Sequence, residues 1–441
     1  MISQIQALPR QPWLKNIPSH WGTMSLKRVM TVHNGATPAS SESSFWEGDI
    51  PWVTPTDLNN SNDPSIQQTG RSITMAGYKS CGTSKVPVGS IIVSTRAPIG
   101  SLGIAAVELC FNQGCRGLVG NENIHSKYVF YSLMAFKDLL QVYGEGTTFK
   151  ELSTTSLADF TLCRPPIEEQ FLITHYLDAE TVRIDALISA KAGLLDALQD
   201  MKIATGLELA TRGLDTDVAK RSSGIEWIGK IPSHWDIKRN MFLFKERNEE
   251  GQEGYPNLKV SLHTGVSEGD DDEMGSTRVR KQMEDKSSYK LTRKGDVAYN
   301  MMRAWQGAIG AVPTDGLVSP AYVVLAPDDQ LDPRYFEILA RTPGYKKDFE
   351  RYSYGIASFR WRLYWEGFKE IRTPVPPLQE QIAIVEAYTR ACNAIDELVS
   401  HVMAEVKLLR ELRSSTITDA VLGRIDVRAH QEARHPEEAT A

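Results

Sequence analysis

The pentapeptide Ile-Pro-Ser-His-Trp (IPSHW) occurs at residues 17–21 of this 441-residue chain and again at residues 231–235. A tryptophan precedes each copy at the same distance, because Trp13 and Trp227 are also 214 residues apart (227 − 13). Two matches at one offset are typical of an internal repeat, and such a repeat sets the architecture of the whole chain.

A second pair of motifs repeats in the same order. Residues 165–170 read PPIEEQ and residues 376–381 read PPLQEQ, an offset of 211 (376 − 165). A period of 211 to 214 residues is far longer than a solenoid repeat, and each unit is long enough to bury its own core. The sequence therefore predicts a tandem duplication with two domains. Weaker matches lie between the strong ones, pairing Arg-Ala at 96–97 with 303–304 and Thr-Phe-Lys at 148–150 with Ser-Phe-Arg at 358–360.

The globular part of each unit combines strand and helix patterns. Short apolar segments bounded by glycine or proline, such as residues 88–94 and 322–325, predict strands. Apolar periodicity predicts helices over residues 127–140 and 333–349. We therefore expect a mixed α/β fold in both units.

The segments after the two Pro-Pro motifs predict long helices. Apolar residues recur at heptad spacing in two rows of each segment. In the later segment the rows are Tyr388, Ile395, Val402 and Leu409, with Ile384, Ala391, Leu398 and Leu412 as companions. In the earlier segment they are Leu177, Ile184 and Leu198, with Leu187, Leu194 and Met201 as companions. Heptad rows are typical of coiled coils. Antiparallel packing of the two helices within the chain would cover both apolar stripes, and it predicts two globular parts joined by a pseudo-twofold helical pair.

Composition excludes several classes of protein. The chain is 41% hydrophobic and 24% charged, without an apolar run near the roughly 18 residues that a membrane span requires. Its start lacks the pattern of a signal peptide, and five scattered cysteines do not form a disulfide framework. These features predict a cytoplasmic protein with no membrane contact. Cys110 and Cys115 lack a second ligand pair at zinc spacing and are interpreted as buried residues.

The distribution of charge leaves a role in nucleic-acid binding open. A net charge of −6 is unusual for a protein that binds phosphates by itself, although basic residues cluster in the second unit. A structural ion pair or a solvated face explains such arginines and lysines about as well as a DNA contact does. The candidate DNA-binding residues are Arg96, Lys150, Arg278, Arg280, Lys281, Arg303 and Arg360.

The acidic and amide residues of the second motif have two interpretations. Glu169, Gln170, Glu380 and Gln381 suit the start of a helix, where an acidic side chain is favoured by the helix dipole. Their repetition also suits a docking surface that is occupied twice by one kind of partner.

Motifs of enzymatic chemistry are absent from the sequence. We find no GxxxxGK[ST] phosphate loop, no GxGxxG after a strand and no HExxH. His20 and His234 have no nucleophile or carboxylate at a recognisable motif spacing. We expect no catalytic residues and no metal site on this chain.

In combination, these phrases resemble one known family. Residues 211–215 (TRGLD), residues 223–235 (SGIEWIGKIPSHW) and residues 376–381 (PPLQEQ) are similar to the specificity subunits of Type I restriction-modification enzymes. The resemblance spans nearly the whole chain, from about residue 13 to about residue 428.

The resemblance implies an architecture and a set of partners. Two target recognition domains would each read one half of a split DNA sequence, and antiparallel conserved helices would separate them. The chain would bind double-stranded DNA, two methyltransferase subunits and motor-nuclease subunits. S-adenosylmethionine, ATP and Mg²⁺ would belong to those partners, so that this chain carries no cofactor. The expected parts are a first recognition domain at 1–165, a spacer helix at 166–212, a linker and second recognition domain at 213–375, a second spacer helix at 376–428 and a flexible tail at 429–441.

Two other interpretations stay open from the sequence. The chain could be the specificity subunit of a related split-site system of Type IIB character, in which one partner both cuts and methylates. Alternatively, it could be a two-headed coiled-coil scaffold that does not bind DNA.

Overall fold

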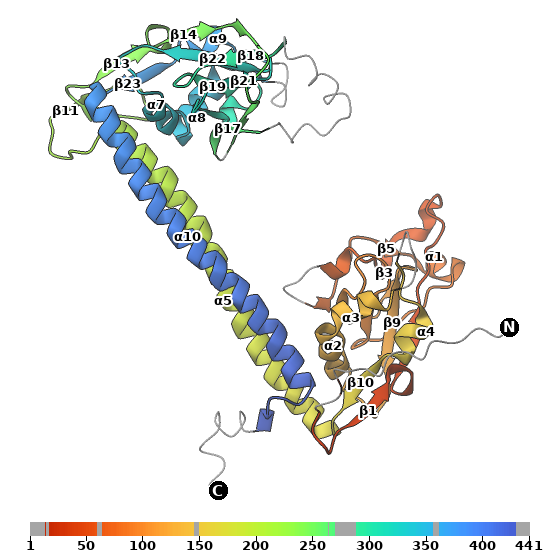
Figure 1. Ribbon diagram of the computed structural model, residues 1–441. Helices are drawn as coiled ribbons and strands as arrows, with labels where there is room; N and C mark the ends of the chain where they lie inside the picture. The colour runs from red at the N-terminus through yellow and green to blue at the C-terminus, as the bar shows by residue number, and fades with distance from the viewer. Residues whose placement is uncertain are drawn as a thin grey trace. The chain divides into compact units, whose positions relative to one another are not determined.

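Two helices of 46 and 44 residues, α5 (Ile167–Arg212) and α10 (Leu378–Val421), organise the computed structural model (Figure 1). The structure describes residue 14 and residues 17–59, 64–144, 150–262, 264–269, 288–355 and 361–428. The chain divides into two compact units, which we call unit 1 (residues 1–192 with 404–441) and unit 2 (residues 193–403). Each long helix contributes residues to both units.

Unit 1 contains a five-stranded sheet and helices that cover it. The sheet has the order β2-β9-β6-β7-β4, and a smaller sheet has the order β5-β3-β8. A separate antiparallel pair, β1 (Gly22–Ser25) with β10 (Thr161–Arg164), brings the start of the globular part to its end, directly before α5. The other elements are β2 (Met30–Asn34), β3 (Trp46–Val53), β4 (Ser65–Ile66), β5 (Ser72–Ile73), α1 (Met75–Ser80), β6 (Ile91–Ser94), β7 (Leu102–Ala105), β8 (Cys110–Phe111), β9 (Cys115–Gly120), α2 (Ser126–Ala135), α3 (Lys137–Val142) and α4 (Thr154–Asp159).

Unit 2 has a related plan. A four-stranded sheet has the order β14-β22-β19-β20, and β13 (Asp236–Arg239) pairs with β23 (Arg372–Val375) directly before α10. The remaining elements are β11 (Lys220–Ser222), β12 (Lys230–Pro232), β14 (Phe244–Arg247), β15 (Glu249–Glu250), β16 (Leu258–Ser261), β17 (Gly265–Glu268), β18 (Lys290–Thr292), β19 (Val297–Asn300), β20 (Ile309–Ala311), β21 (Gly316–Val318), β22 (Tyr322–Pro327), α7 (Pro333–Ala340), α8 (Pro343–Arg351) and α9 (Trp365–Phe368). The mixed α/β class predicted from the sequence is confirmed.

Both predicted helices of the globular parts are interrupted in the structure. The pattern over residues 333–349 forms α7 and α8, because Pro343 cannot continue a helix and begins a new one. The side chain of Thr342 caps that new helix by accepting a hydrogen bond from the Tyr345 N–H group. Residues 127–140 are likewise divided between α2 and α3, with the break at Phe136.

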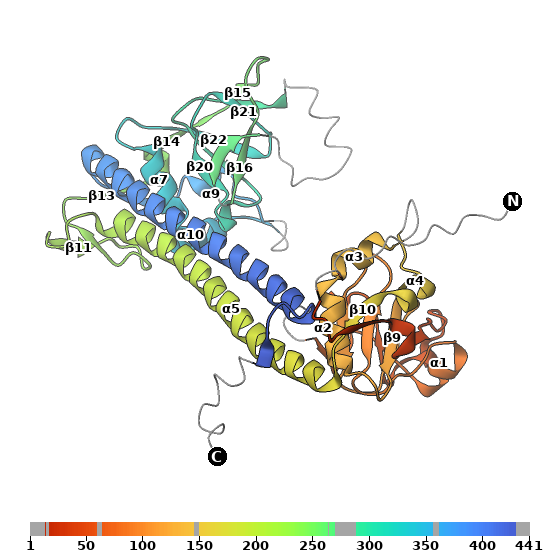
Figure 2. The same ribbon diagram turned by 60° about the horizontal axis from the view of Figure 1, so that its bottom comes forward.

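The long helices run side by side within each unit, as Figures 1 and 2 show. In unit 2, Leu198 of α5 packs with Ile395 and Val402 of α10 in one buried cluster. In unit 1, the Arg413 guanidinium on α10 forms an ion pair with Asp185 on α5 (Nε to Oδ1, 2.8 Å). The helical segments of each unit are therefore held by both apolar and charged contacts.

Only one of the two predicted heptad rows lies at the helix interface. Leu198, Ile395 and Val402 are buried, whereas five residues of the companion row are between 41% and 56% exposed; Ile384 of that row is buried in the core of unit 2. Lysine side chains occupy part of the interface instead, since Lys191 reaches Glu405 (2.5 Å) and Lys202 reaches Asp396. The exposed companion residues are Leu187, Leu194, Met201, Leu398 and Leu412. The sequence pattern alone does not distinguish these two rows, because both are equally apolar.

The helices in the described part of the chain differ from membrane spans in length or in apolar character. None of them is both long and apolar enough to cross a bilayer.

Candidate functional site

The two repeated motifs of unit 1 meet at the start of α5. The His20 Nε2 atom lies 2.8 Å from Glu169 Oε1, and the Trp21 indole N–H group donates a hydrogen bond to Glu169 Oε2 (2.9 Å). Glu169 is in the first turn of α5, where a carboxylate is favoured by the helix dipole. One glutamate therefore joins the IPSHW motif to the helix that follows PPIEEQ.

The corresponding motifs of unit 2 meet in the same way at the start of α10. The His234 Nε2 atom lies 2.8 Å from Glu380 Oε2. Trp235 is buried, but its indole nitrogen has no hydrogen-bond partner among the described residues. The histidine–glutamate contact thus recurs in both units, whereas the tryptophan–glutamate hydrogen bond is found only in unit 1 among the described residues. Sequence reasoning missed these pairs, because 149 and 146 residues separate the partners.

A left-handed glycine closes the other end of each junction. Gly423 (φ 69°) follows α10 and packs on the IPSHW motif of unit 1, where an added Cβ would lie 2.6 Å from Pro18. Gly213 (φ 76°) follows α5 and packs in unit 2, where a Cβ would lie 2.9 Å from Glu380 Oε1 and 3.1 Å from Trp235. Glycine is required at both positions by the positive φ and by the close contact. In each unit the motif therefore connects the start of one long helix to the end of the other.

The two predicted partner-binding glutamines are buried inside these junctions. Gln170 Oε1 accepts a hydrogen bond from the His125 N–H group (2.9 Å), and its Nε2 donates to the Pro165 carbonyl (2.9 Å). Gln381 Oε1 accepts from the Asp332 N–H group (2.8 Å), and its Nε2 donates to two backbone carbonyls. Both amides fasten the start of a helix of the globular part, α2 or α7, to a long helix. Glu169 and Glu380, with side chains 17% and 23% exposed, are the members of the predicted set that solvent reaches.

The predicted DNA-binding residues are placed only in part by the structure. Arg96 is exposed and forms an ion pair with Glu151 (Nε to Oε2, 3.2 Å), as the structural interpretation of this residue predicts. Lys150 is exposed, and Arg303 is half-buried directly before a short 3-10 turn at Ala304–Gln306. Arg278, Arg280, Lys281 and Arg360 lie outside the described residues. The DNA-binding assignment of all seven residues stays a prediction.

Sequence reasoning also missed an arginine that is held by aromatic side chains. The Arg71 guanidinium carbon lies 3.6 Å from the centroid of the Trp46 ring and 5.7 Å from that of Trp52. Such a cation–π contact orients an arginine. The two tryptophans belong to β3, whereas Arg71 directly precedes β5, so no local spacing marks the contact.

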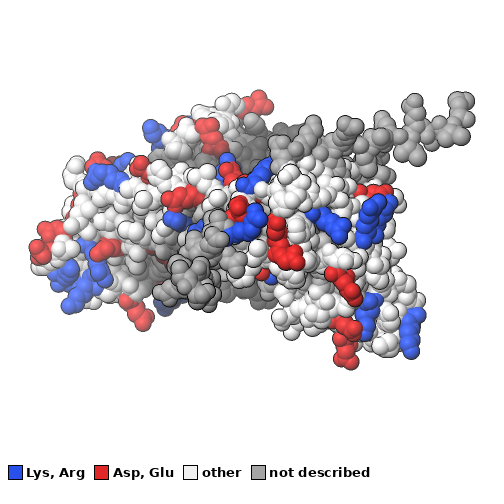
Figure 3. Space-filling model, turned by 90° about the horizontal axis from the view of Figure 1, so that it is seen from below, with Lys and Arg blue, Asp and Glu red and all other residues white. Residues whose placement is uncertain are grey.

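The cysteines that the sequence singles out are buried, and the described residues contain no metal-binding cluster. Cys110 and Cys115 are buried, as predicted, and burial raises the pKa of each thiol to about 12. In the described part of the chain, no group of three or more histidine, cysteine or acidic residues is arranged to hold a metal ion. On the face that Figure 3 shows, basic and acidic side chains are interspersed.

Known proteins are similar to this chain in sequence and in fold. Residues 18–192 match the model of the Type I restriction modification DNA specificity domain. The chain is 33% identical over 229 residues to the Type I restriction enzyme MjaIX specificity subunit of Methanocaldococcus jannaschii, a match that covers 51% of each protein and so about half of that relative's length. It is 20% identical over 451 residues to the EcoBI specificity subunit of Escherichia coli, covering 96% and 90% of the two chains.

Two solved structures have the same fold. A chain from a study of complex assembly and conformational transition of the type I R-M system aligns with a TM-score of 0.66 at 13% identity, covering 93% of this chain and all of that one. The HsdS subunit of Thermoanaerobacter tengcongensis aligns with a TM-score of 0.50 at 14% identity, covering 93% and 98%. The resemblance predicted from the repeated motifs is therefore confirmed: this chain is similar to the specificity subunits of Type I restriction-modification enzymes, and its residues 18–192 match the model of the DNA specificity domain.

Proposed function

We propose that this chain is the non-catalytic subunit that recognises DNA in a Type I restriction-modification complex. The observation that carries the proposal is the match of residues 18–192 to a DNA specificity domain. The methyl donor S-adenosylmethionine, ATP and Mg²⁺ would be bound by partner subunits, since the sequence lacks the motifs that hold such groups.

We further propose that each unit reads one half of a bipartite target. Support comes from the junction that recurs in unit 2, where His234 contacts Glu380 as His20 contacts Glu169 in unit 1. Because the histidine–glutamate contact attaches both globular parts to the long helices, we extend the recognition role of the first part to the second. Arginine contacts to guanine and amide contacts to adenine would supply the base readout within each half.

The exposed apolar row on the long helices supports docking of two methyltransferase subunits. Leu187 and Leu398 are 211 residues apart (398 − 187), as are Met201 and Leu412 (412 − 201), and all four are exposed. Large apolar side chains at heptad spacing on a helix surface are typical of a site that another helix covers. Because the row occurs once in each repeat, it suits two copies of one partner. Motor-nuclease subunits would join the complex through the methyltransferase assembly.

Methylation mapping tests the proposal. DNA from cells that express this chain with its cognate methyltransferase should carry one modified split motif. Exchange of residues of about 22–160 for those of another family member should change one half of that motif and leave the other half intact. The absence of any modified motif would refute the role in DNA recognition and favour a scaffold. A motif whose two halves both change in the exchange would refute the assignment of one half to each unit.

A second measurement tests the absence of catalysis. The purified chain, incubated alone with labelled S-adenosylmethionine and DNA that carries the motif, should transfer no methyl group. Transfer by the chain alone would refute the assignment of the chemistry to partner subunits.

A further inference from the structure

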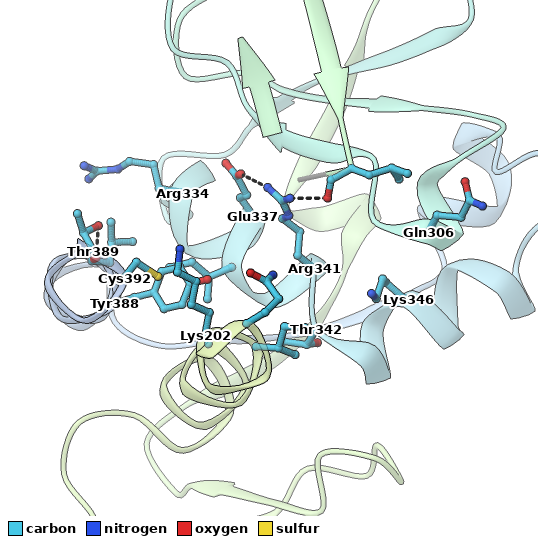
Figure 4. A pocket seen from close by; sticks show the side chains of 16 residues that line it. Lys202, Gln306, Arg334, Glu337, Arg341, Thr342, Lys346, Tyr388, Thr389 and Cys392 are labelled. Atoms are coloured by element: carbon cyan, nitrogen blue, oxygen red, sulfur yellow. Dashed lines mark hydrogen bonds and ion pairs between the residues drawn. The ribbon is translucent and has the colours of Figure 1, made fainter. Parts of the chain in front are cut away.

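Unit 2 contains a groove of about 780 Å³ where the globular part meets the long helices. Helix α7 forms one wall, and α5 and α10 form another, as Figure 4 shows. Lys202 and Cys392 contribute from the long helices, and Arg341, Lys346 and Gln306 contribute from the globular part. All of these residues belong to one compact unit.

The groove is lined by cationic and other polar side chains together with apolar ones. Four lining side chains are cationic, namely Lys202, Arg334, Arg341 and Lys346, and Glu337 is the one carboxylate that lines it among the described residues. Both oxygens of Glu337 are engaged, since Oε2 accepts a hydrogen bond from the Ala311 N–H group (2.9 Å) and Oε1 accepts from Arg341 (3.1 Å). The carboxylate therefore holds Arg341 in place and has little remaining capacity to accept a hydrogen bond from a ligand.

Lys346 is the cation with the most available charge. Lys202 and Arg334 form ion pairs with carboxylates beside the groove, Asp396 and Asp332. No carboxylate among the described residues forms an ion pair with Lys346, which lies in the first turn of α8 and lines the groove. The Lys346 ammonium group and the Arg341 guanidinium, which Glu337 holds, both line the groove and favour an anionic occupant.

A smaller cationic cavity, of about 220 Å³, occupies the corresponding place in unit 1. It is lined by Arg410 and Arg413, which lie 211 residues after Gln199 and Lys202 (410 − 199 and 413 − 202). The ion pair repeats as well, because Arg413 contacts Asp185 as Lys202 contacts Asp396. Met134 lines this cavity at the position that corresponds to Arg341 in unit 2. One cationic position of the groove and its ion pair therefore recur in both repeats.

We propose that the unit 2 groove binds the sugar-phosphate backbone of duplex DNA and that this contact is independent of base sequence. The inference rests on the proposed function and adds a binding site to it. Gln306 lines the groove and ends the short turn that follows Arg303. Lys346 lies against that turn, since a Cβ on Gly307 would be 3.2 Å from Lys346 Cδ. The groove thus adjoins the Arg-Ala segment that the two repeats share, and phosphate contacts of this kind fix the position of a protein on DNA without reading bases.

The salt dependence of DNA binding tests the proposal. The full chain, assembled with its methyltransferase, is compared with a Lys346→Gln variant on a duplex that carries the mapped motif and on one that lacks it. The logarithm of the association constant for DNA falls linearly with the logarithm of the salt concentration. Loss of one phosphate contact should make this fall less steep by about 0.9 and weaken binding about fivefold at 0.15 M salt. Both duplexes should be affected equally, and the methylated motif should stay the same.

The matched control is Lys347→Gln, which removes the same charge from the next residue of α8. Lys347 lines a different cavity, together with Trp227 and Arg351, and is exposed. This variant should keep the salt slope of the unchanged chain. Equal slopes for Lys346→Gln and the unchanged chain, or a shift in the methylated motif, would overturn the proposal.

Cys392 offers an independent probe of the occupant. It lines the groove, and apart from Cys81 the other cysteines are buried, with pKa values raised to about 12 by burial. In a Cys81→Ser background, duplex DNA should slow the reaction of Cys392 with a maleimide severalfold, whereas the methyltransferase alone should not. Protection by the methyltransferase alone would assign the groove to a protein segment and overturn the proposal.

The two experiments separate this inference from the proposed function. An assembled complex that binds no DNA would refute both. A complex that binds and methylates its motif, while Cys392 reacts at an unchanged rate and Lys346→Gln has no effect, would refute the groove contact alone.

Discussion

Replacement of Gln381 by alanine should destabilise unit 2 by an amount that the structure allows us to estimate. The Gln381 side chain accepts one hydrogen bond from the Asp332 N–H group and donates two, to the carbonyls of Gln330 and Pro376, each 2.8 Å long. The side chain is fully buried. At about 1 kcal/mol for each hydrogen bond, Gln381→Ala should lower the free energy of unfolding by about 3 kcal/mol.

A neighbouring glutamine and its counterpart in unit 1 make the prediction sharper. Gln379 is exposed in the same turn of α10, so that Gln379→Ala should change the free energy of unfolding by less than about 0.5 kcal/mol. Gln170→Ala should cost about 2 kcal/mol, because Gln170 forms two such hydrogen bonds, each 2.9 Å long. Urea denaturation followed by tryptophan fluorescence measures all three. A Gln381→Ala variant as stable as Gln379→Ala would show that the buried amide does not fasten α7 to α10.

Three further substitutions test other features of the structure. Gly423→Ala should lower the free energy of unfolding by about 1–3 kcal/mol, because φ is positive and the added Cβ meets Pro18. Gly193 lies in an open helical position, so Gly193→Ala should raise the free energy of unfolding by about 0.5–1 kcal/mol. Denaturation midpoints of the two variants that move in the same direction would contradict this prediction. Burial raises the pKa of the Glu337 carboxyl, so the contribution of Glu337 to stability should fall as pH rises from its pKa in the unfolded chain to its pKa in the folded protein. Glu337→Gln should therefore flatten the dependence of the thermal midpoint on pH in that window. An unchanged dependence on pH would show that Glu337 does not titrate with a raised pKa. Leu398→Lys should weaken binding of the methyltransferase at least tenfold, measured by calorimetry, and leave the thermal stability of the chain unchanged. If the variant and the unchanged chain bind the methyltransferase with equal affinity, the exposed row is not part of the docking surface.

The sequence predicts which motifs matter better than it predicts what they contact. His20 and His234 have no partner at a motif spacing, and Glu169 and Glu380 resemble ordinary helix starts, so local patterns connect neither histidine to a glutamate. In the structure the histidines contact the glutamates across nearly 150 residues. The two motifs recur at almost the same offset, which suggests that they lie together in each unit. A single sequence contains no direct measure of a contact between them.

The helix boundaries show which local signals sequence analysis can use. Pro343 interrupts the pattern over residues 333–349, and a proline at that place is a sequence signal for the break between α7 and α8. The choice between two apolar rows on the long helices has no such signal. It depends on Lys191 and Lys202, whose charged ends find carboxylates on the opposite helix while their stems cover the interface.

The cationic groove could not be predicted, because its residues converge from distant segments. Lys202 belongs to α5, Gln306 to a short turn and Lys346 to α8. Lys346 belongs to a basic run on α8, but the segments that contain Lys202 and Gln306 are not basic, and the chain as a whole is acidic. Charge that is distributed in this way becomes a binding surface only when tertiary packing brings it together.

The composition of the first unit determines the order in which the nascent chain can fold. Tyr128 donates a hydrogen bond to the Val421 carbonyl (3.2 Å), and the same core contains Ile417 and Leu422 from the last part of the described chain. Residues 193–403 form a contiguous unit, so they can complete their packing while the ribosome is still translating α10. The globular part that is synthesised first must therefore keep an open core until residues 417–421 of α10 and the segment after it have been translated.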